Sequence, residues 1–135
     1  MMKIRMFFFM LLSFAAALYA ADLDYPASYR EMGLPEYTNA AVSVLGRDNS
    51  SVHDGISITL ITDESDASLR AYYETEMQAR GWILEETIAS KKMRAAGMLD
   101  QMPFGAVFSK DGMRYQVFAA KQADGKTIHI SVVSE

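Results

Sequence analysis

A helical periodicity stands out between residues 66 and 80. Apolar side chains recur there at i, i+3, i+4 and i+8, a spacing that puts them on one side of an α-helix: Leu69, Tyr72, Tyr73 and Met77. Either Ser65 or Asp63 is placed to cap the first amides, and the acids around them suit the positive end of a helix dipole. Gly81 follows where a left-handed residue ends a helix, and Trp82 is placed to fold back on Met77. The pattern predicts an amphipathic helix that packs on a flat surface.

The C-terminal third alternates apolar and polar residues around two Asp-Gly pairs, Asp111-Gly112 and Asp124-Gly125. Asp-Gly favours two-residue hairpin turns, because both positions need positive φ. The pairs therefore predict a three-stranded meander over 104–109, 113–121 and 127–133. The first turn pairs Phe108 with Tyr115, Ala106 with Val117 and Phe104 with Ala119. The second turn pairs Ala119 with Ile130 and Val117 with Val132. Both registers share one apolar face, for which the helix is the natural cover: Phe104, Ala106, Phe108, Tyr115, Val117, Ala119, Ile128, Ile130 and Val132.

Shorter patterns complete the expected fold. Residues 41–45 and 56–62 read as strands, the latter with Ile56, Ile58 and Leu60 on one face. Residues 82–87 are compatible with a strand. Residues 88–102 are either a loop or a second helix with Ile88, Ala95, Leu99 and Met102 inward, and Gly97 disfavours the helix by about 1 kcal/mol. The fold class is α+β: an antiparallel sheet of four to five strands with one main helix on one face.

The N-terminus has the layout of a secretory signal peptide. Lys3 and Arg5 precede an uncharged apolar run that ends in Ala20 and Ala21. We place cleavage after Ala20, with Ala21 as the alternative; the other interpretation is an uncleaved anchor, although the run is short for a spanning helix. The expected organisation is a signal peptide at 1–20, an extended lead-in at 21–37 with a turn of helix near 28–32, and one domain at 38–135.

Composition narrows the compartment and the partners. The chain has no cysteine, so it has no lipid-attachment cysteine, disulfide or thiolate metal site. Removing Lys3 and Arg5 lowers the basic residues from 13 to 11 against 17 acidic ones, a net charge of −6. An acidic chain without a basic run is a poor candidate for nucleic acid or an anionic membrane. We expect a periplasmic protein, or a secreted one, with no stable membrane anchor after cleavage.

Candidate chemistry is sparse. His53 lies in a polar turn, His129 is placed on the sheet face away from the core, and neither has further ligands at a recognisable spacing. The acids at 63, 64 and 66 fit a helix N-terminus better than a cation site. Glu85 and Glu86 point to opposite faces if they lie on a strand. No serine stands in a nucleophile motif and no glycine-rich loop is present. We therefore expect no catalytic residue, metal or cofactor, and not an enzyme.

The candidate binding residues lie on the other face of the meander. Val107, Phe118 and Val133 point outward by the registers above, with Phe118 opposite Gly105 and Ser131. This face has three interpretations: Phe118 packs locally over the glycine, segment 88–102 covers it, or it binds a partner. Met93 and Met98 join the candidates because methionines suit adaptable binding surfaces. The alternative function is a carrier of a lipid or cell-wall fragment, with a pocket between helix and sheet lined by Tyr72, Tyr115 and Trp82.

The layout resembles a group of small exported bacterial domains. Leu34 to Ala40 (LPEYTNA) resembles their P-x-Y-P-x-A opening, with Thr38 in place of the second proline. Ile61-Thr62-Asp63, Tyr72-Tyr73 and Gly81-Trp82 are similar to their strand end, helix and helix stop. The helix-on-sheet layout is more distantly similar to the repeated domain of the lipoprotein in the outer-membrane barrel-assembly machine. Such domains are mostly periplasmic proteins or lipoproteins of unassigned function, so the resemblance implies an exported periplasmic domain and assigns no functional residue. From the candidate binding residues we expect a non-enzymatic accessory protein that binds another envelope protein.

Overall fold

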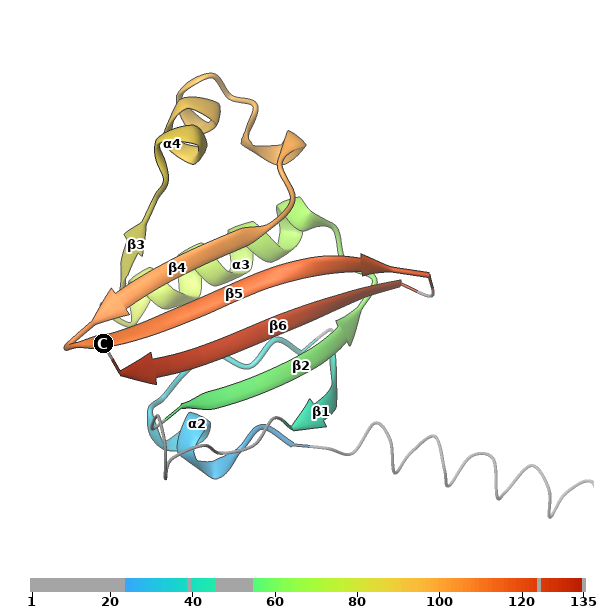
Figure 1. Cartoon of the computed structure of the whole chain (residues 1–135), viewed down its shortest axis with the longest axis vertical. Helices are drawn as coiled ribbons and strands as arrows, with labels where there is room; N and C mark the ends of the chain where they lie inside the picture. The colour runs from blue at the N-terminus through green and yellow to red at the C-terminus, as the bar shows by residue number, and fades with distance from the viewer. Residues whose placement is uncertain (1–23, 39, 46–54, 124, 135) are drawn as a thin grey trace, which may run out of the picture.

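The computed structural model describes residues 24–38, 40–45, 55–123 and 125–134. The predicted signal peptide at 1–20 and the polar turn with His53 lie outside these residues. One antiparallel sheet has the strand order β1-β2-β6-β5-β4-β3 (Figure 1). Its strands are β1 (Ala41–Leu45), β2 (Ile56–Thr62), β3 (Ile83–Glu85), β4 (Gly105–Lys110), β5 (Met113–Gln122) and β6 (Gly125–Ser134). The helices are α2 (Ala27–Glu31), α3 (Asp66–Ala79), α4 (Ile88–Ala95) and the 3-10 turn η1 (Leu99–Gln101).

The α+β class is confirmed, but the expected number of strands is not. The sheet has six strands instead of four to five, because the first two predicted strands, the short segment after the main helix and the meander all join one sheet. Segment 82–87 contributes only Ile83–Glu85, which pairs with residues 107–109 of β4. The start of β4, at Gly105, therefore extends beyond the end of β3.

Helix α3 forms as its local signals predict. Ser65 is the N-cap, with its hydroxyl accepting the Ser68 amide at 3.1 Å. The helix ends as Gly81 takes φ +85 and the Trp82 amide donates to the Met77 carbonyl at 3.0 Å. These bonds satisfy groups at both ends of the helix that it cannot pair internally.

The first hairpin has the predicted register, with Phe108 opposite Tyr115 and Ala106 opposite Val117. Its turn residues Asp111 and Gly112 take φ 50 and φ 77, as this kind of turn requires.

The predicted register of the second hairpin is wrong by two residues. Ala119 pairs with Ile128 and Val117 with Ile130, because Gln122 pairs with Gly125 and the turn precedes the glycine. Gly125 begins β6 with φ 138, a conformation that other residues rarely adopt. β6 is also fixed by β2, with Ile130 opposite Ile58. A shift of two keeps every side chain on its predicted face, so the apolar face is unchanged.

The predicted second helix over 88–102 is only half formed. It ends at Ala95 because Gly97 takes φ +70, after which η1 leads to β4. Two of the four side chains predicted to be inward, Ile88 and Ala95, are exposed, with Ile88 at 76%. We call residues 86–104 the arch, since Figure 1 shows this segment projecting beyond the β4 edge of the sheet.

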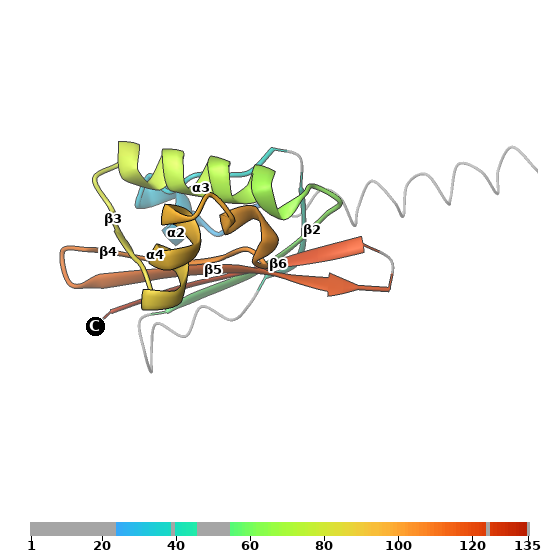
Figure 2. The same ribbon diagram turned by 90° about the horizontal axis from the view of Figure 1, so that it is seen from above.

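The core lies between the sheet and helices α2 and α3, which share one face of the sheet (Figure 2). The lead-in contributes Tyr25, Tyr29, Leu34 and Tyr37 to this core, so it is part of the packed unit. The Tyr29 hydroxyl donates to the Pro35 carbonyl, which leaves it to accept from the Tyr115 hydroxyl at 2.8 Å. This chain of hydrogen bonds ties the lead-in to the first half of β5. The Tyr73 hydroxyl, by contrast, is buried with no partner among the described residues.

This hydrogen-bond chain predicts an unequal effect of removing its hydroxyls. Tyr29→Phe leaves both the Tyr115 hydroxyl and the Pro35 carbonyl unpaired, and we expect a loss of about 1–3 kcal/mol for each buried group. Tyr115→Phe leaves the Tyr29–Pro35 bond intact and is expected to lose about 0.5–1.5 kcal/mol. Tyr73→Phe removes an unpartnered hydroxyl and serves as a control that is neutral or stabilising. Urea unfolding of the three variants measures the order, and equal losses for Tyr29→Phe and Tyr73→Phe would contradict the chain.

The tyrosine core also predicts alkaline sensitivity. Burial raises the pKa of Tyr29, Tyr73 and Tyr115, and it raises the pKa of half-buried Tyr72 to about 12. A pKa raised in the folded state contributes stability that is present below the unfolded pKa of about 10 and is lost as pH rises toward the folded value.

We expect the free energy of unfolding to fall above pH about 10 by about 1.4 kcal/mol per pH unit for each fully buried tyrosine. Urea melts at increasing pH, followed together with tyrosinate absorbance, measure this decline. Tyr115→Phe is expected to show a shallower decline. Tyrosinate absorbance that rises fully before unfolding would show that these rings titrate in the folded state.

Candidate functional site

The sheet face opposite α2 and α3, which we call the outer face, carries three of the five predicted partner-binding residues: Val107, Phe118 and Val133. Figure 2 shows the helices gathered on the other side of the sheet. No described helix or strand lies across the outer face, and Phe118 is 50% exposed at its centre. An exposed aromatic ring in such a position is a feature of surfaces that bind other molecules.

Phe118 has defined neighbours across the strands. Gly105 lies opposite it on β4, and His129 lies opposite on β6 in place of the predicted Ser131. The rings of Phe118 and His129 stack, with centroids 5.0 Å apart and planes 25° apart. The nitrogens of His129 lie 3.4 Å from the Thr59 hydroxyl and 3.1 Å from the Thr127 hydroxyl. These contacts hold the imidazole flat under one face of Phe118, so the pair forms a rigid platform.

The other two predicted residues lie on the outer face at different distances from this platform. Val107 is half-buried two residues along β4 from Gly105, opposite Gln116, and is therefore a diagonal neighbour of Phe118. Val133 is half-buried opposite Arg114, two cross-strand pairs farther along β5 and β6 on the same face. The structure therefore brings Val107 and Phe118 together, but places Val133 apart from them.

A groove of about 390 Å³ separates the platform from the arch. Its sheet side is formed by Phe118, Val107 and Gly105. Its opposite side is formed by Pro103 and by Thr87 and Ser90 at the start of α4. The arch therefore borders the outer face instead of covering it, and Gly105 lies past the end of β3 along this border.

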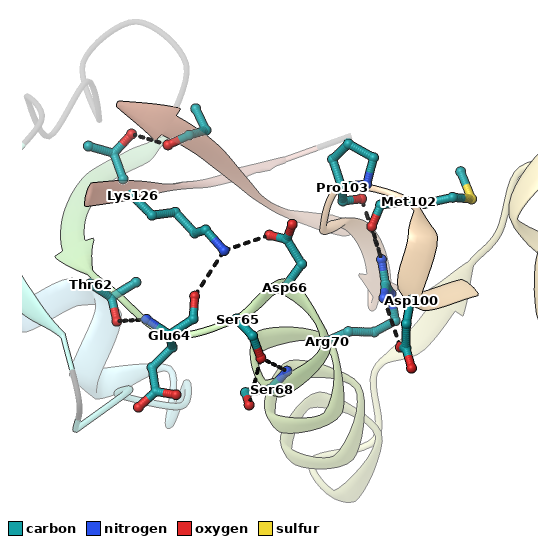
Figure 3. A network of polar contacts seen from close by, with 12 residues as sticks. Thr62, Glu64, Ser65, Asp66, Ser68, Arg70, Asp100, Met102, Pro103 and Lys126 are labelled. Carbon is teal, nitrogen blue, oxygen red and sulfur yellow. Dashed lines mark hydrogen bonds and ion pairs between the residues drawn. The ribbon is translucent and has the colours of Figure 1, made fainter. Parts of the chain in front are cut away.

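Two arginines attach the arch to α3. Arg70 is 7% exposed, and its guanidinium donates to the Met102 carbonyl at 3.0 Å and to the Pro103 carbonyl at 3.4 Å (Figure 3). Asp100 supplies its counter-charge at 3.5 Å. Arg94 lies between two carboxylates, at 2.8 Å from Glu74 on α3 and 3.1 Å from Glu86, and these hydrogen bonds raise the pKa of its guanidinium. The arch is thus held to α3 by polar contacts at its middle and at its end.

The two predicted methionines lie at the middle of the arch. The Met98 amide donates to the Met93 carbonyl at 2.8 Å, which closes the C-terminal end of α4. Met93 is half-buried and Met98 is 42% exposed. They are neighbours on the arch and do not belong to the groove lining.

The residues predicted to line a ligand pocket pack against other side chains. Tyr115 has no exposed surface and touches Trp82 at a ring distance of 6.0 Å and Tyr73 at 6.5 Å. Tyr72 is half-buried against Tyr37, with ring centroids 4.6 Å apart. The space between α3 and the centre of the sheet is occupied by these rings, and the described cavities lie at its margins.

Two of the acidic residues around the start of α3, Glu64 and Asp66, contact Lys126. The Lys126 ammonium lies 3.0 Å from the Asp66 carboxylate and 2.9 Å from the Glu64 carbonyl (Figure 3). Glu85 and Glu86 separate as expected, the first accepting from the Ser109 hydroxyl and the second from Arg94. Within the part of the chain that the structure describes, no three His, Asp or Glu side chains form a metal-binding group.

Comparisons with known proteins give no relative: no family model, no curated protein and no solved structure matches the chain. Among the described helices, none is long and apolar enough to cross a lipid bilayer.

Sequence reasoning missed three residues that shape this region: Arg70, Arg94 and His129. Arg70 lies one position after the apolar Leu69, and helical spacing places it beside the core stripe, a position that long side chains with a polar end can occupy. The Glu86–Arg94 separation of eight residues crosses a helix start, so no local rule detects the pair. His129 could be paired with Phe118 only once the register of β6 was known.

The anchoring role of Arg70 makes a testable prediction. Arg70→Met keeps most of the apolar stem but leaves two backbone carbonyls without their donor, and we expect a loss of about 1–3 kcal/mol. Hydrogen exchange at 98–104 is expected to rise while the centre of β5 stays protected. Arg30→Met, which removes only exposed ion pairs, is the matched control and is expected to leave stability nearly unchanged, because exposed ion pairs contribute little. Unchanged exchange in the arch of Arg70→Met would refute the anchoring role.

Proposed function

We propose that this protein is an exported, non-enzymatic accessory protein of the bacterial envelope that binds another protein through its outer face. The observation that carries the proposal is the half-exposed Phe118 at the centre of a sheet face that no described element crosses. A soluble sheet commonly has one solvated face, but that face is normally polar. The outer face departs from that rule, because Phe118 stacks on His129 there and lines a groove together with Val107.

The shape of the region suits a polypeptide partner. The platform is flat, Val107 extends it along β4, and the groove beside it is open to the border of the sheet. Phe118 provides a large apolar contact with little conformational freedom to lose, since His129 already holds its ring. The N-terminal layout and the resemblance to small exported bacterial domains support placing this interaction in the periplasm.

The decisive experiment is crosslinking in intact envelopes of the source cells with the tagged protein and its Phe118→Glu variant. We expect a partner that is captured by the wild type and lost by at least about tenfold with Phe118→Glu, because a buried unpaired carboxylate opposes binding. Met32→Glu is the matched control, since Met32 is also an exposed apolar residue, at 39%, next to α2.

Unfolding curves of both variants verify that the fold is retained. A partner captured equally by the wild type and by Phe118→Glu would remove the outer face from the proposal. Capture that is lost equally with Met32→Glu would show a general effect of added charge.

A further inference from the structure

Helix α4 presents a continuous exposed side that its sequence pattern had assigned to the core. Ile88, Lys91, Lys92 and Ala95 recur at i, i+3, i+4 and i+7, so they lie on one side of the helix, and all four are exposed. Ile88 is 76% exposed, and Met98 just beyond the helix is 42% exposed. Ser90 and Met93, on the other side, are half-buried. We call the exposed set, Ile88, Lys91, Lys92, Ala95 and Met98, the α4 surface.

This helix is kept in place by polar contacts and not by burial of its own residues. None of its residues is buried. The Thr87 hydroxyl accepts the Ser90 amide at 3.1 Å, and Arg94 bridges Glu74 and Glu86. A helix of eight residues is marginal by itself in water. Two salt bridges thus hold in place a short helix whose residue Ile88 faces the solvent.

The uncompensated charge on this part of the arch is positive. Lys91 and Lys92 have no ion-pair partner among the described residues, whereas Glu86 is paired with Arg94 and Asp100 with Arg70. The chain as a whole carries −4, so the lysine pair is a local exception. Salt screens charges beyond about 8 Å at physiological ionic strength, so the distant acidic residues of the chain contribute little to what a molecule bound at Lys91 and Lys92 experiences.

We propose that the α4 surface binds an acidic segment of a partner protein that also carries apolar side chains. Carboxylates would meet Lys91 and Lys92, and apolar side chains would cover Ile88 and Met98. An anionic membrane is the less suitable occupant, because recognition of anionic lipids by charge requires clusters of about four to eight basic residues, and the α4 surface has two. The inference goes beyond the proposed function, because it concerns a second surface that is separate from Phe118.

The test is an amide NMR titration of the protein, purified from cells that express the whole chain, with two synthetic peptides. Each is about 15 residues long with leucine along one helical side; one carries glutamate at the remaining positions and its twin carries lysine. We expect the glutamate peptide to shift the amides of residues 87–98 and the lysine twin to leave them unchanged.

Matched variants separate charge from fold. Lys91→Glu/Lys92→Glu is expected to weaken the glutamate peptide by at least about tenfold, because two attractive contacts become repulsive. Lys121→Glu/Lys126→Glu introduces the same charge change at the β5–β6 hairpin, and Lys121→Glu alone spares the Lys126–Asp66 pair; both are expected to retain binding. Ile88→Ser is expected to weaken binding without changing its dependence on salt.

Each contrary result overturns the proposal. Absence of shifts in α4 at millimolar glutamate peptide, or equal shifts with both peptides, would show that the surface does not select acidic segments. Binding to vesicles containing phosphatidylglycerol but not to the glutamate peptide, lost in Lys91→Glu/Lys92→Glu, would assign the surface to lipid. Neither result bears on the Phe118 crosslinking experiment, so the two surfaces fail or stand separately.

Discussion

The hydrogen-bond chain from Tyr115 through Tyr29 to Pro35 is the constraint on which the arrangement of this fold depends. Tyr115 lies near the start of β5 with no exposed surface, so its hydroxyl must find a partner inside the protein. That partner comes from a segment 86 residues earlier in the chain. Meeting this requirement draws the lead-in onto the sheet and places α2 beside α3. Both helices are then on the same face.

The position of the lead-in determines what remains exposed. With α2 and α3 together over the core, the described chain supplies no second layer for the other face of the sheet (Figure 2). The outer face is therefore stabilised within the plane of the sheet by cross-strand neighbours: Phe118 on His129, and His129 between two threonine hydroxyls. The contacts that stabilise this face in water also fix the position of Phe118. The same side-chain contacts therefore stabilise the sheet and form the candidate binding platform.

Local signals predicted the elements whose causes are local. The cap at Ser65, the apolar side of α3 and the stop at Gly81 all lie within a few residues of one another, and so does the Asp111-Gly112 turn. The predicted register of β6 is wrong because the turn is not its only determinant: β6 pairs with β2 over seven residues as well as with β5 over ten. The prediction that Phe118 points outward is still correct, because a shift of two residues preserves the face of each side chain. The predicted cross-strand neighbour, Ser131, is wrong, because any shift of register changes the neighbours, and His129 takes its place.

The arch shows the limit of periodicity as a guide to burial. Ile88 and Ala95 have the spacing of a core-facing stripe, yet both face solvent, because Arg70 and Arg94 fix the orientation of the arch from outside the pattern. Because polar contacts hold the arch in this orientation, Ile88 of α4 stays exposed, and the described chain does not bury its apolar surface. The outer face and the arch border one groove, but the platform is aromatic, whereas the α4 surface is basic and aliphatic. A partner that engages both would be selected twice, by shape at Phe118 and by charge at Lys91 and Lys92, and such separate requirements exclude molecules that satisfy only one of them.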